Sequence, residues 1–229
     1  ITSIARVGKN IDKDGKAEGI SLTYNDYYSF NGQRLILKSG EYGKDGSEYV
    51  TEKFSNVKIK AKGNLSGKAW KGPEYWEITF EDGSQAWYGN AAESRTPIEY
   101  NISKWKDAQG NYIVYRYIQS ENVSVIYSIE WGGNEALGKP HFNKMTFQYA
   151  ERDLKESSFV AGEEFIQNKI LTSVQVDASD KQFKKYVINY HNGENGTKYQ
   201  FVNNITEYNS NNEPSNPVIF EYQKSQNSG

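Results

Sequence analysis

Cysteine is absent from the 229-residue chain, and histidine occurs only as His141 and His191. The lack of cysteine excludes disulfide bonds, thiolate nucleophiles and cysteine-based metal sites together. A serine or cysteine nucleophile activated by a base needs a histidine in most of its known arrangements. His191 stands beside an Asn-Gly turn and His141 follows a proline, so we predict solvated or locally hydrogen-bonded rings. We therefore expect no catalytic, cofactor-binding or metal-binding residues.

Strong charge and long apolar runs are also lacking. The formal net charge is −2, which gives no electrostatic attraction to nucleic acid or to an anionic membrane. No run approaches the ~18 apolar residues of a membrane-spanning helix. No glycine-rich phosphate loop precedes a helix. From these absences we predict that the chain does not bind nucleic acid and does not insert directly into a membrane.

Aliphatic residues are scarce, and aromatic residues make up part of the deficit. The apolar fraction is 36% and includes 18 tyrosines. A tyrosine ring covers apolar area while its hydroxyl stays at water or at a hydrogen-bond partner. Such a composition is typical of sheets with thin cores and wet outer faces.

Apolar and polar residues alternate with a period of two, which indicates half-buried strands. We expect Trp76 and Ile78 to point inward and Glu77 to point outward. Trp131 is expected on the same face of its strand as Tyr127. The alternating segments are Asn56–Lys62, Tyr75–Glu81, Ser124–Trp131, Lys144–Ala150 and Lys185–His191.

Lysines 58, 60 and 62 occupy one face of the first of these segments. A row of lysines on a strand is typical of a solvated face and also protects a sheet edge from unwanted pairing. We expect this face to lie in solvent.

Turn signals separate the alternating segments. Asn-Gly and Asp-Gly pairs favour the positive φ angles of tight hairpins. They occur at Asp14-Gly15, Asn31-Gly32, Asp45-Gly46, Asp82-Gly83, Asn192-Gly193 and Asn195-Gly196.

The predicted fold is all-β, a meandering antiparallel sheet that forms a curved open sheet or a sandwich-like arrangement, with little or no helix. One short helical turn is expected within Arg152–Phe159. We predict a single domain over residues 1–222 that ends with a loop at Tyr208–Pro217 and a strand at Val218–Tyr222. Residues 223–229 are expected to be a linker or tail.

The segment Asn10-x-Asp12-x-Asp14-Gly15 has the spacing that opens a calcium loop. The twelfth position of such a loop is Ser21 in place of the usual bidentate glutamate. We expect a hairpin turn here, and the sequence leaves open whether Asn10, Asp12 and Asp14 bind calcium.

The sequence also contains residues that suit a glycosidase site or a sugar-stacking site. A glycosidase needs two carboxyl groups at a set separation, but neighbouring acids arise by chance in a chain with 29 of them. Exposed tryptophan would serve sugar stacking, and Trp70, in a glycine-rich loop, is the best candidate for exposure. The acid pairs are Glu74 with Glu77, Glu151 with Asp153 and Glu163 with Glu164, and the other tryptophans are Trp76, Trp87, Trp105 and Trp131.

A series of landmarks resembles a known family. It includes Asn31-Gly32-Gln33-Arg34-Leu35, then Gly40–Thr51 with the letters GEYGKDGSEYVT, and then Gly72-Pro73-Glu74-Tyr75-Trp76-Glu77. Tyrosine-rich segments at Asp107–Tyr117 and Tyr186–Tyr190 follow. The series is similar to the N-terminal domain of SpvB-like plasmid virulence proteins and of the B component of insecticidal toxin complexes (Tc), within the RHS/YD-repeat shell class.

That resemblance implies a non-catalytic β-wall segment of a secreted bacterial toxin-delivery protein. Its partners would be adjoining segments of the same shell and an encapsulated effector polypeptide, with docking to a channel component through a downstream propeller. The alternatives are a cell-surface glycan-binding β module and, less favoured, a carbohydrate-active β-sandwich enzyme. A wall segment is expected to leave a long unpaired sheet edge, and a closed, self-sufficient barrel would count against it.

Overall fold

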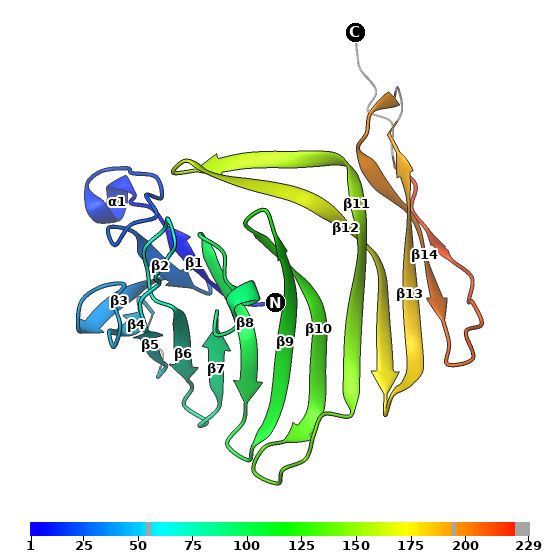
Figure 1. Cartoon of the computed structure of the whole chain (residues 1–229), viewed down its shortest axis with the longest axis horizontal. Coiled ribbons are helices and arrows are strands. Elements are labelled where there is room, and N and C mark those ends of the chain that lie inside the picture. Colours follow the sequence, from blue (N-terminus) through cyan, green and yellow to red (C-terminus); the bar gives the residue numbers. More distant parts are fainter. Residues whose placement is uncertain (54–55, 194–195, 223–229) are drawn as a thin grey trace. The chain divides into compact units, whose positions relative to one another are not determined.

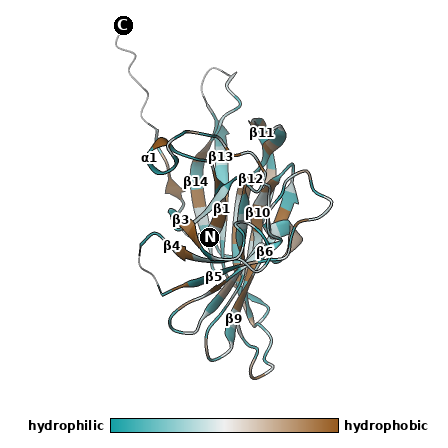
Figure 2. Cartoon of the chain, turned by 90° about the vertical axis from the view of Figure 1, so that its left-hand side faces the viewer, coloured by the Kyte–Doolittle hydropathy of each residue, from teal (hydrophilic) through white to brown (hydrophobic). Residues whose placement is uncertain are grey.

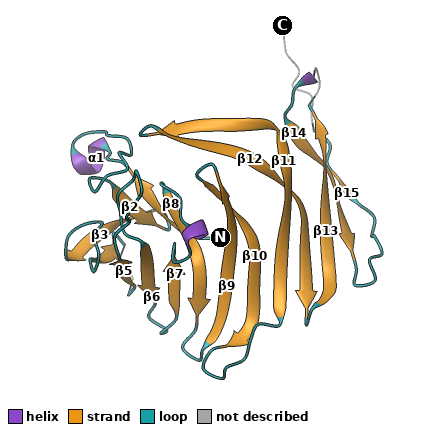
Figure 3. Ribbon diagram, in the orientation of Figure 1, coloured by secondary structure: helices purple, strands orange, loops and turns teal. Residues whose placement is uncertain are grey.

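The computed structural model describes residues 1–53, 56–193 and 196–222. Strands dominate the fold (Figure 3), as the sequence predicted. Helical structure is sparse and includes α1 (Ile11–Asp14) and the 3-10 turn η1 (Ala92–Ser94). No helix among the described residues is long and apolar enough to cross a membrane.

The chain folds into two compact units. Unit 1 contains Ile1–Phe142 and Ser157–Ile166, and unit 2 contains Asn143–Glu156 and the residues from Gln167 on. The chain passes from one unit to the other within two strands, β11 (Asn143–Val160) and β12 (Glu163–Ala178).

Unit 1 holds the first ten strands, which pair antiparallel in chain order (Figure 1). They are β1 (Ser3–Val7), β2 (Tyr27–Phe30), β3 (Gln33–Ser39), β4 (Glu48–Thr51), β5 (Lys58–Lys62), β6 (Tyr75–Thr79), β7 (Gln85–Tyr88), β8 (Glu99–Lys106), β9 (Asn111–Ser120) and β10 (Val123–Asn134).

The first eight strands close into a barrel, because β1 pairs with β2 on one side and with β8 on the other. Ile4 faces Phe30 across one pairing and Tyr100 across the other. The strand β8 is shared: its first residues pair with β1, whereas Lys104–Lys106 pair with β9. The barrel is thus closed while the sheet continues beyond it into β9 and β10. The sequence predicted a curved open sheet or a sandwich-like arrangement, and it did not predict this closure.

The barrel interior follows from the alternation seen in the sequence. Brown and teal residues alternate along the strands in Figure 2. Trp76 and Ile78 are fully buried, and Phe80 packs against the same core, as predicted. Tyrosines surround Trp76 in this core: Tyr28, Tyr49 and Tyr100 each lie within ring-contact distance of it.

The outer face of the barrel carries a row of paired charges. Neighbouring positions on β4, β5, β6, β7 and β8 are Glu48, Lys60, Glu77, Trp87 and Lys104. The Lys60 ammonium lies 3.0 Å from the Glu48 carboxylate, and the Lys104 ammonium lies 5.3 Å from the Trp87 ring centre. Cross-strand pairs of opposite charge stabilise a sheet slightly. The lysine face of β5 is the solvated face that the sequence predicted, and the structure adds the pairing of Lys60 with Glu48.

Tight turns lie at several of the predicted glycine pairs and also at places without one, but the turn predicted at Asn192-Gly193 was wrong, since Asn192 ends β13 and neither residue has positive φ. Asn31 and Gly32 both have positive φ and join Phe30 to Gln33, the geometry of a two-residue hairpin. Glu121-Asn122, Ala161-Gly162 and Ser179-Asp180 form turns with the same signature. The predicted Asn195-Gly196 turn includes a residue outside the described part of the chain. The predicted tail, residues 223–229, lies wholly outside it.

Two other local predictions were wrong. A register shift lies between Ile126 and Ser128 in β10, so Tyr127 is exposed and Ser128 is fully buried. A bulge of this kind moves the following side chains to the other face. The helical turn expected within Arg152–Phe159 is instead part of the strand β11. Polar and apolar residues alternate in this segment, and strand pairing satisfies its backbone hydrogen-bonding groups.

Unit 2 is a sheet made by the stems of β11 and β12 together with β13 (Lys181–Asn192), β14 (Gln200–Tyr208) and β15 (Val218–Ile219). The last strand is shorter than the predicted Val218–Tyr222. The loop before it is folded locally, because the Asn209 carboxamide oxygen accepts from the backbone of Asn211 and Glu213. Nothing among the described strands pairs with the outer side of β15.

Candidate functional site

A buried arginine forms the polar centre of unit 1. Arg6 lies near the end of β1, and its side chain is 0% exposed. Its Nη1 lies 3.2 Å from Oδ2 of Asp26, which is 3% exposed. The second carboxylate oxygen of Asp26 accepts from the backbone N–H and the hydroxyl of Ser21. A buried charge of either sign requires such pairing, because desolvation of an unpaired ion is costly.

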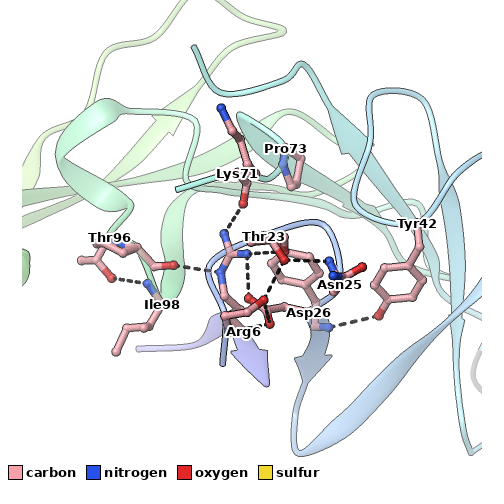
Figure 4. Close-up of polar contacts among 12 residues, drawn as sticks. Arg6, Thr23, Asn25, Asp26, Tyr42, Lys71, Pro73, Thr96 and Ile98 are labelled. Atoms are coloured by element: carbon pink, nitrogen blue, oxygen red, sulfur yellow. Dashed lines mark hydrogen bonds and ion pairs between the residues drawn. The ribbon is translucent and has the colours of Figure 1, made fainter. Parts of the chain in front are cut away.

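The same guanidinium ties three chain segments together (Figure 4). It donates from Nε to the Pro97 carbonyl at 2.9 Å, from Nη2 to the Lys71 carbonyl at 2.5 Å, and from Nη1 to the Thr23 carbonyl at 3.3 Å. These carbonyls precede β8, β6 and β2. Antiparallel strands that start at one end of the barrel bring their preceding loops together there, and Arg6 reaches that end because β1 finishes at it.

The glycine of the Gly72-Pro73 motif lies against this centre. Gly72 has φ +154, and a Cβ at this position would meet the hydroxyl oxygens of Tyr28 at 2.6 Å and Tyr100 at 2.9 Å. The Tyr100 hydroxyl donates to the Pro73 carbonyl at 2.7 Å. Glycine is therefore required for close approach as well as for its backbone angle. Burial raises the pKa of Tyr28 to about 12 and raises the pKa of Tyr100 well above its usual value, so both phenols stay neutral.

We call this buried centre the plug, because Arg6 ties together the loops at one end of the barrel. Every nitrogen of the Arg6 guanidinium has a protein acceptor. Arg6 and Asp26 were not among the residues singled out from the sequence. The available signal was the position of Arg6 two residues after Ile4, which places a charge on the apolar face of an alternating strand.

The calcium-like segment forms a capped helical turn in place of a hairpin. The Asn10 side-chain oxygen accepts from the Lys13 N–H at 2.9 Å, and Gly15 ends the turn with a left-handed backbone. The Asp14 carboxylate accepts two hydrogen bonds from Arg34, at 2.8 and 2.9 Å. Two of the three proposed calcium ligands are thus engaged within the protein. No group of three or more acidic or histidine side chains in the described residues has the geometry of a metal site.

The Asp14–Arg34 pair predicts a pH dependence of stability. The Arg34 hydrogen bonds lower the pKa of Asp14 from 3.8 to about 2. Because the pKa is lower in the folded state, this contribution is present above about pH 4 and is lost as the pH falls toward 2. We expect the stability difference between wild type and D14N, measured by urea titration, to shrink between pH 5 and pH 2. A difference that stays constant over that range would contradict this role of Asp14.

The two histidines make local contacts. His141 packs its ring on Tyr112 at 4.0 Å, and its Nε2 lies 3.1 Å from the Tyr112 carbonyl. Its Nδ1 lies 3.8 Å from the Glu130 carboxylate. His191, on β13, packs near Phe201 and Tyr222. The local hydrogen bonding predicted for His141 is confirmed.

Five of the six carboxylates in the acid pairs have separate partners, and Asp153 is held through its backbone. Glu74 lies 3.9 Å from Arg95, and Glu77 accepts from Gln85. Glu151 lies 3.6 Å from Lys169. Glu164 accepts from the Ser157 hydroxyl, and the Asn122 carboxamide donates to the Glu163 carboxylate at 3.5 Å. The Asp153 N–H donates to Gln200.

The tryptophans are distributed through unit 1 without forming an open platform. Trp76 is buried as predicted, and Trp105 packs against the core from the side. Trp87 and Trp131 are half-buried. Trp70, the expected exposed residue, is also half-buried, with the Lys68 ammonium 5.2 Å from its ring centre.

The last two strands of unit 2 present an apolar face at an unpaired edge. Register places Ile205 opposite Val218, and the Phe220 N–H donates to the Asn203 carbonyl. Val218 and Phe220 are exposed, as are Phe201 and Tyr222, whose rings lie 5.3 Å apart. Backbone groups alternate in direction along a strand, so the N–H and C=O of Ile219 point away from β14. We call this combination the β15 edge.

Comparison with known proteins identifies the fold. The chain matches the N-terminal domain of effector protein SpvB from Salmonella typhimurium strain LT2 with a TM-score of 0.67 and 12% identity, covering 91% of this chain and 86% of that one. It matches a TcdB2–TccC3–Cdc42 crystal structure with a TM-score of 0.70 and 10% identity, covering 98% of this chain. A Photorhabdus luminescens Tc holotoxin pore gives a TM-score of 0.67 at 11% identity. No family model and no curated protein sequence matches the chain.

These matches confirm the resemblance predicted from the sequence landmarks at the level of the fold. The chain spans 14% of the length of the matched Tc shell chains and most of the SpvB domain. Identities of 10–12% establish shared architecture and leave function to be argued from the molecule itself.

Proposed function

We propose that the chain is a non-catalytic wall segment of a secreted bacterial toxin-delivery shell of the RHS type, in which it helps to enclose an effector polypeptide. The single observation that carries the proposal is the β15 edge, an unpaired apolar strand on a fold shared with Tc shell proteins. An exposed edge strand is a ready template for pairing with another strand. Its partner in the proposal is the adjoining segment of the same shell.

The closed barrel counts against a wall built from all the strands, and the proposal is therefore restricted to the strands outside the barrel. A closed barrel has no free edge, so β1 to β8 offer no pairing surface to another segment. The barrel would then act as a closed starting piece, and only the strands outside it would join a wall. The free backbone groups of Ile219 and the exposed faces of Val218 and Phe220 are where that joining would occur.

The polar centre supports a structural role as well. Each nitrogen of the Arg6 guanidinium donates to an acceptor of the protein, and most of the acids considered as catalytic groups, together with His141, have local polar partners. The proposal therefore assigns the buried polar groups to holding the barrel end closed. The relatives' secretion and assembly with other chains enter as part of the proposal, since SpvB is described as an effector and the Tc relative as a holotoxin pore.

The proposal is tested by the product of the complete gene carrying I219K. Lysine on an edge strand opposes strand pairing, so we expect the variant to lose closed hollow particles in electron micrographs that the wild-type product forms. It should also lose protease protection of the enclosed segment. L137K is the matched control, because Leu137 and Ile219 are almost equally exposed, at 67% and 66%.

Two outcomes would overturn the proposal. One is a wild-type gene product that forms no hollow particle. The other is an I219K product whose particles and protease protection equal those of L137K.

A further inference from the structure

Unit 2 contains a small hollow with an excess of positive charge. Its volume is about 120 Å³, and its lining includes Arg152, Glu156 and Lys198. These side chains contribute two positive charges and one negative charge. Lys198 has no ion-pair partner among the described residues, so one positive charge in the hollow is uncompensated.

Arg152 is incompletely paired inside this hollow. Its Nη1 lies 3.3 Å from a Glu156 carboxylate oxygen, and Glu156 is 58% exposed. An ion pair to such an exposed carboxylate is screened by water and contributes little. The Arg152 Nε is buried and has no hydrogen-bond partner among the described residues. A buried unpaired donor of this kind calls for an explanation, and an unseen water or ion is the common one.

The surroundings favour a carboxylate. Leu154 and Ile170, both half-buried, are among the lining residues, and partial exclusion of water strengthens electrostatic attraction relative to open water. Tyr199 also lines the hollow. Arginine presents its N–H groups in a planar fork that matches a carboxylate, and with Nη1 directed to Glu156 the other edge of the guanidinium remains for a ligand.

The hollow is built on paired strands and a fixed connection. Arg152 and Leu154 lie on one face of β11, and the Gln200 side chain accepts from the Asp153 N–H at 2.9 Å. That bond joins β11 to the start of β14 and holds the segment containing Lys198 beside Arg152.

We propose that this hollow is a carboxylate-binding site in which Arg152 and Lys198 receive an acidic side chain of a polypeptide ligand. The inference is independent of the proposed shell function, because it rests on the charge and shape of the hollow alone.

The test is an NMR titration of the isotope-labelled chain at low, matched ionic strength. The probes are a blocked Ala-Asp-Ala peptide, the corresponding Ala-Asn-Ala peptide, and sodium acetate. We expect a saturable shift of the Ile170 and Gln200 amide signals with the aspartate peptide and none with the asparagine peptide. R152Q should weaken binding about ten-fold or more, the equivalent of one lost charged hydrogen bond, and K198Q should weaken it less.

Controls separate binding from folding. R152K keeps the charge and is expected to retain part of the affinity. K155Q removes a lysine from the opposite face of β11 and should leave the affinity unchanged. Tighter binding of the aspartate peptide than of acetate supports a polypeptide ligand. Equal affinities would overturn the polypeptide ligand and leave a site for small free acids. The site itself is overturned if the aspartate peptide causes no saturable shift, or if R152Q binds it as tightly as wild type.

Discussion

Replacing Arg6 with methionine is expected to lower the free energy of unfolding of unit 1 by about 3–5 kcal/mol, the usual cost of removing one partner from a buried ion pair. Methionine fills much of the volume but leaves the Asp26 carboxylate, 3% exposed, without its cation. It also leaves the carbonyls of Thr23, Lys71 and Pro97 without their donor. The measurement is urea denaturation followed by tryptophan fluorescence.

The readout is specific for this unit, because all five tryptophans lie within Ile1–Phe142. R116M is the control, since Arg116 is 55% exposed and lies 3.8 Å from Glu130. Such an exposed pair contributes roughly 0–1 kcal/mol. The double variant R6M/D26N should recover part of the loss, because it removes the stranded charge. A cost for R6M as small as that of R116M would contradict the assignment of Arg6 as the plug.

Replacing Trp76 with alanine is expected to cost a similar amount, about 3–5 kcal/mol, because it empties the centre of the barrel core. Trp76 is fully buried and contacts the rings of Tyr28, Tyr49 and Tyr100. These tyrosines are held by their own hydroxyl hydrogen bonds, such as that of Tyr100 to Pro73. The surrounding rings are therefore poorly placed to collapse into the cavity, which favours the upper part of the range.

Phenylalanine at position 76 is the informative comparison. The Trp76 Nε1 has no hydrogen-bond partner among the described residues. W76F therefore loses ring contacts but also removes a buried unpaired donor, which itself costs roughly 1–3 kcal/mol. We expect W76F to retain well over half of the stability that W76A loses, measured by urea titration of the four remaining tryptophans. W70A, at a half-buried loop position, is the control. Equal losses for W76F and W76A would show that the indole N–H is satisfied and that packing alone does not explain the site.

The barrel strands could be predicted because their alternation is strict. In β5 and β6 the inward residues are apolar, whereas the outward ones are charged or carry a hydroxyl group, so each face follows from the sequence. In β10 the inserted residue between Ile126 and Ser128 changes the face of the side chains that follow it up to Glu130, after which the register shifts again. A polar Ser128 gives no sign that it is the buried residue and Tyr127 the exposed one.

Turns were predictable only where glycine occurs with asparagine or aspartate. Ser179-Asp180 and Glu121-Asn122 adopt positive φ without glycine, which asparagine and aspartate tolerate better than most residues do. The Glu121-Asn122 turn is fixed by later residues: Asn122 donates to the Glu164 carbonyl, and the Ile166 N–H donates to the Glu121 carbonyl. Contacts over such a sequence separation have no local signature.

The barrel closure and the Arg6 centre could not be predicted either, because they also depend on contacts between residues far apart in the sequence. Pairing of Ile4 with Tyr100 depends on the curvature accumulated over the intervening strands, and no single segment encodes it. The Arg6 acceptors are backbone carbonyls, which every residue possesses. The Gly72-Pro73 motif was noticed for its likeness to a family, and the structure adds its physical cause in the contact with Tyr28 and Tyr100.

Strand β8 changes partner along its length, and the sheet therefore has two unlike ends. One half of the strand closes a ring with β1, and the other half starts a new row with β9. The N-terminal end of the sheet is thereby a capped end to which no further strand adds, whereas in the proposed function β15 is the end at which the sheet grows. Strands could be inserted or deleted after β8 in evolution without reopening the ring, so the number of strands outside the barrel is free to vary while the barrel stays constant.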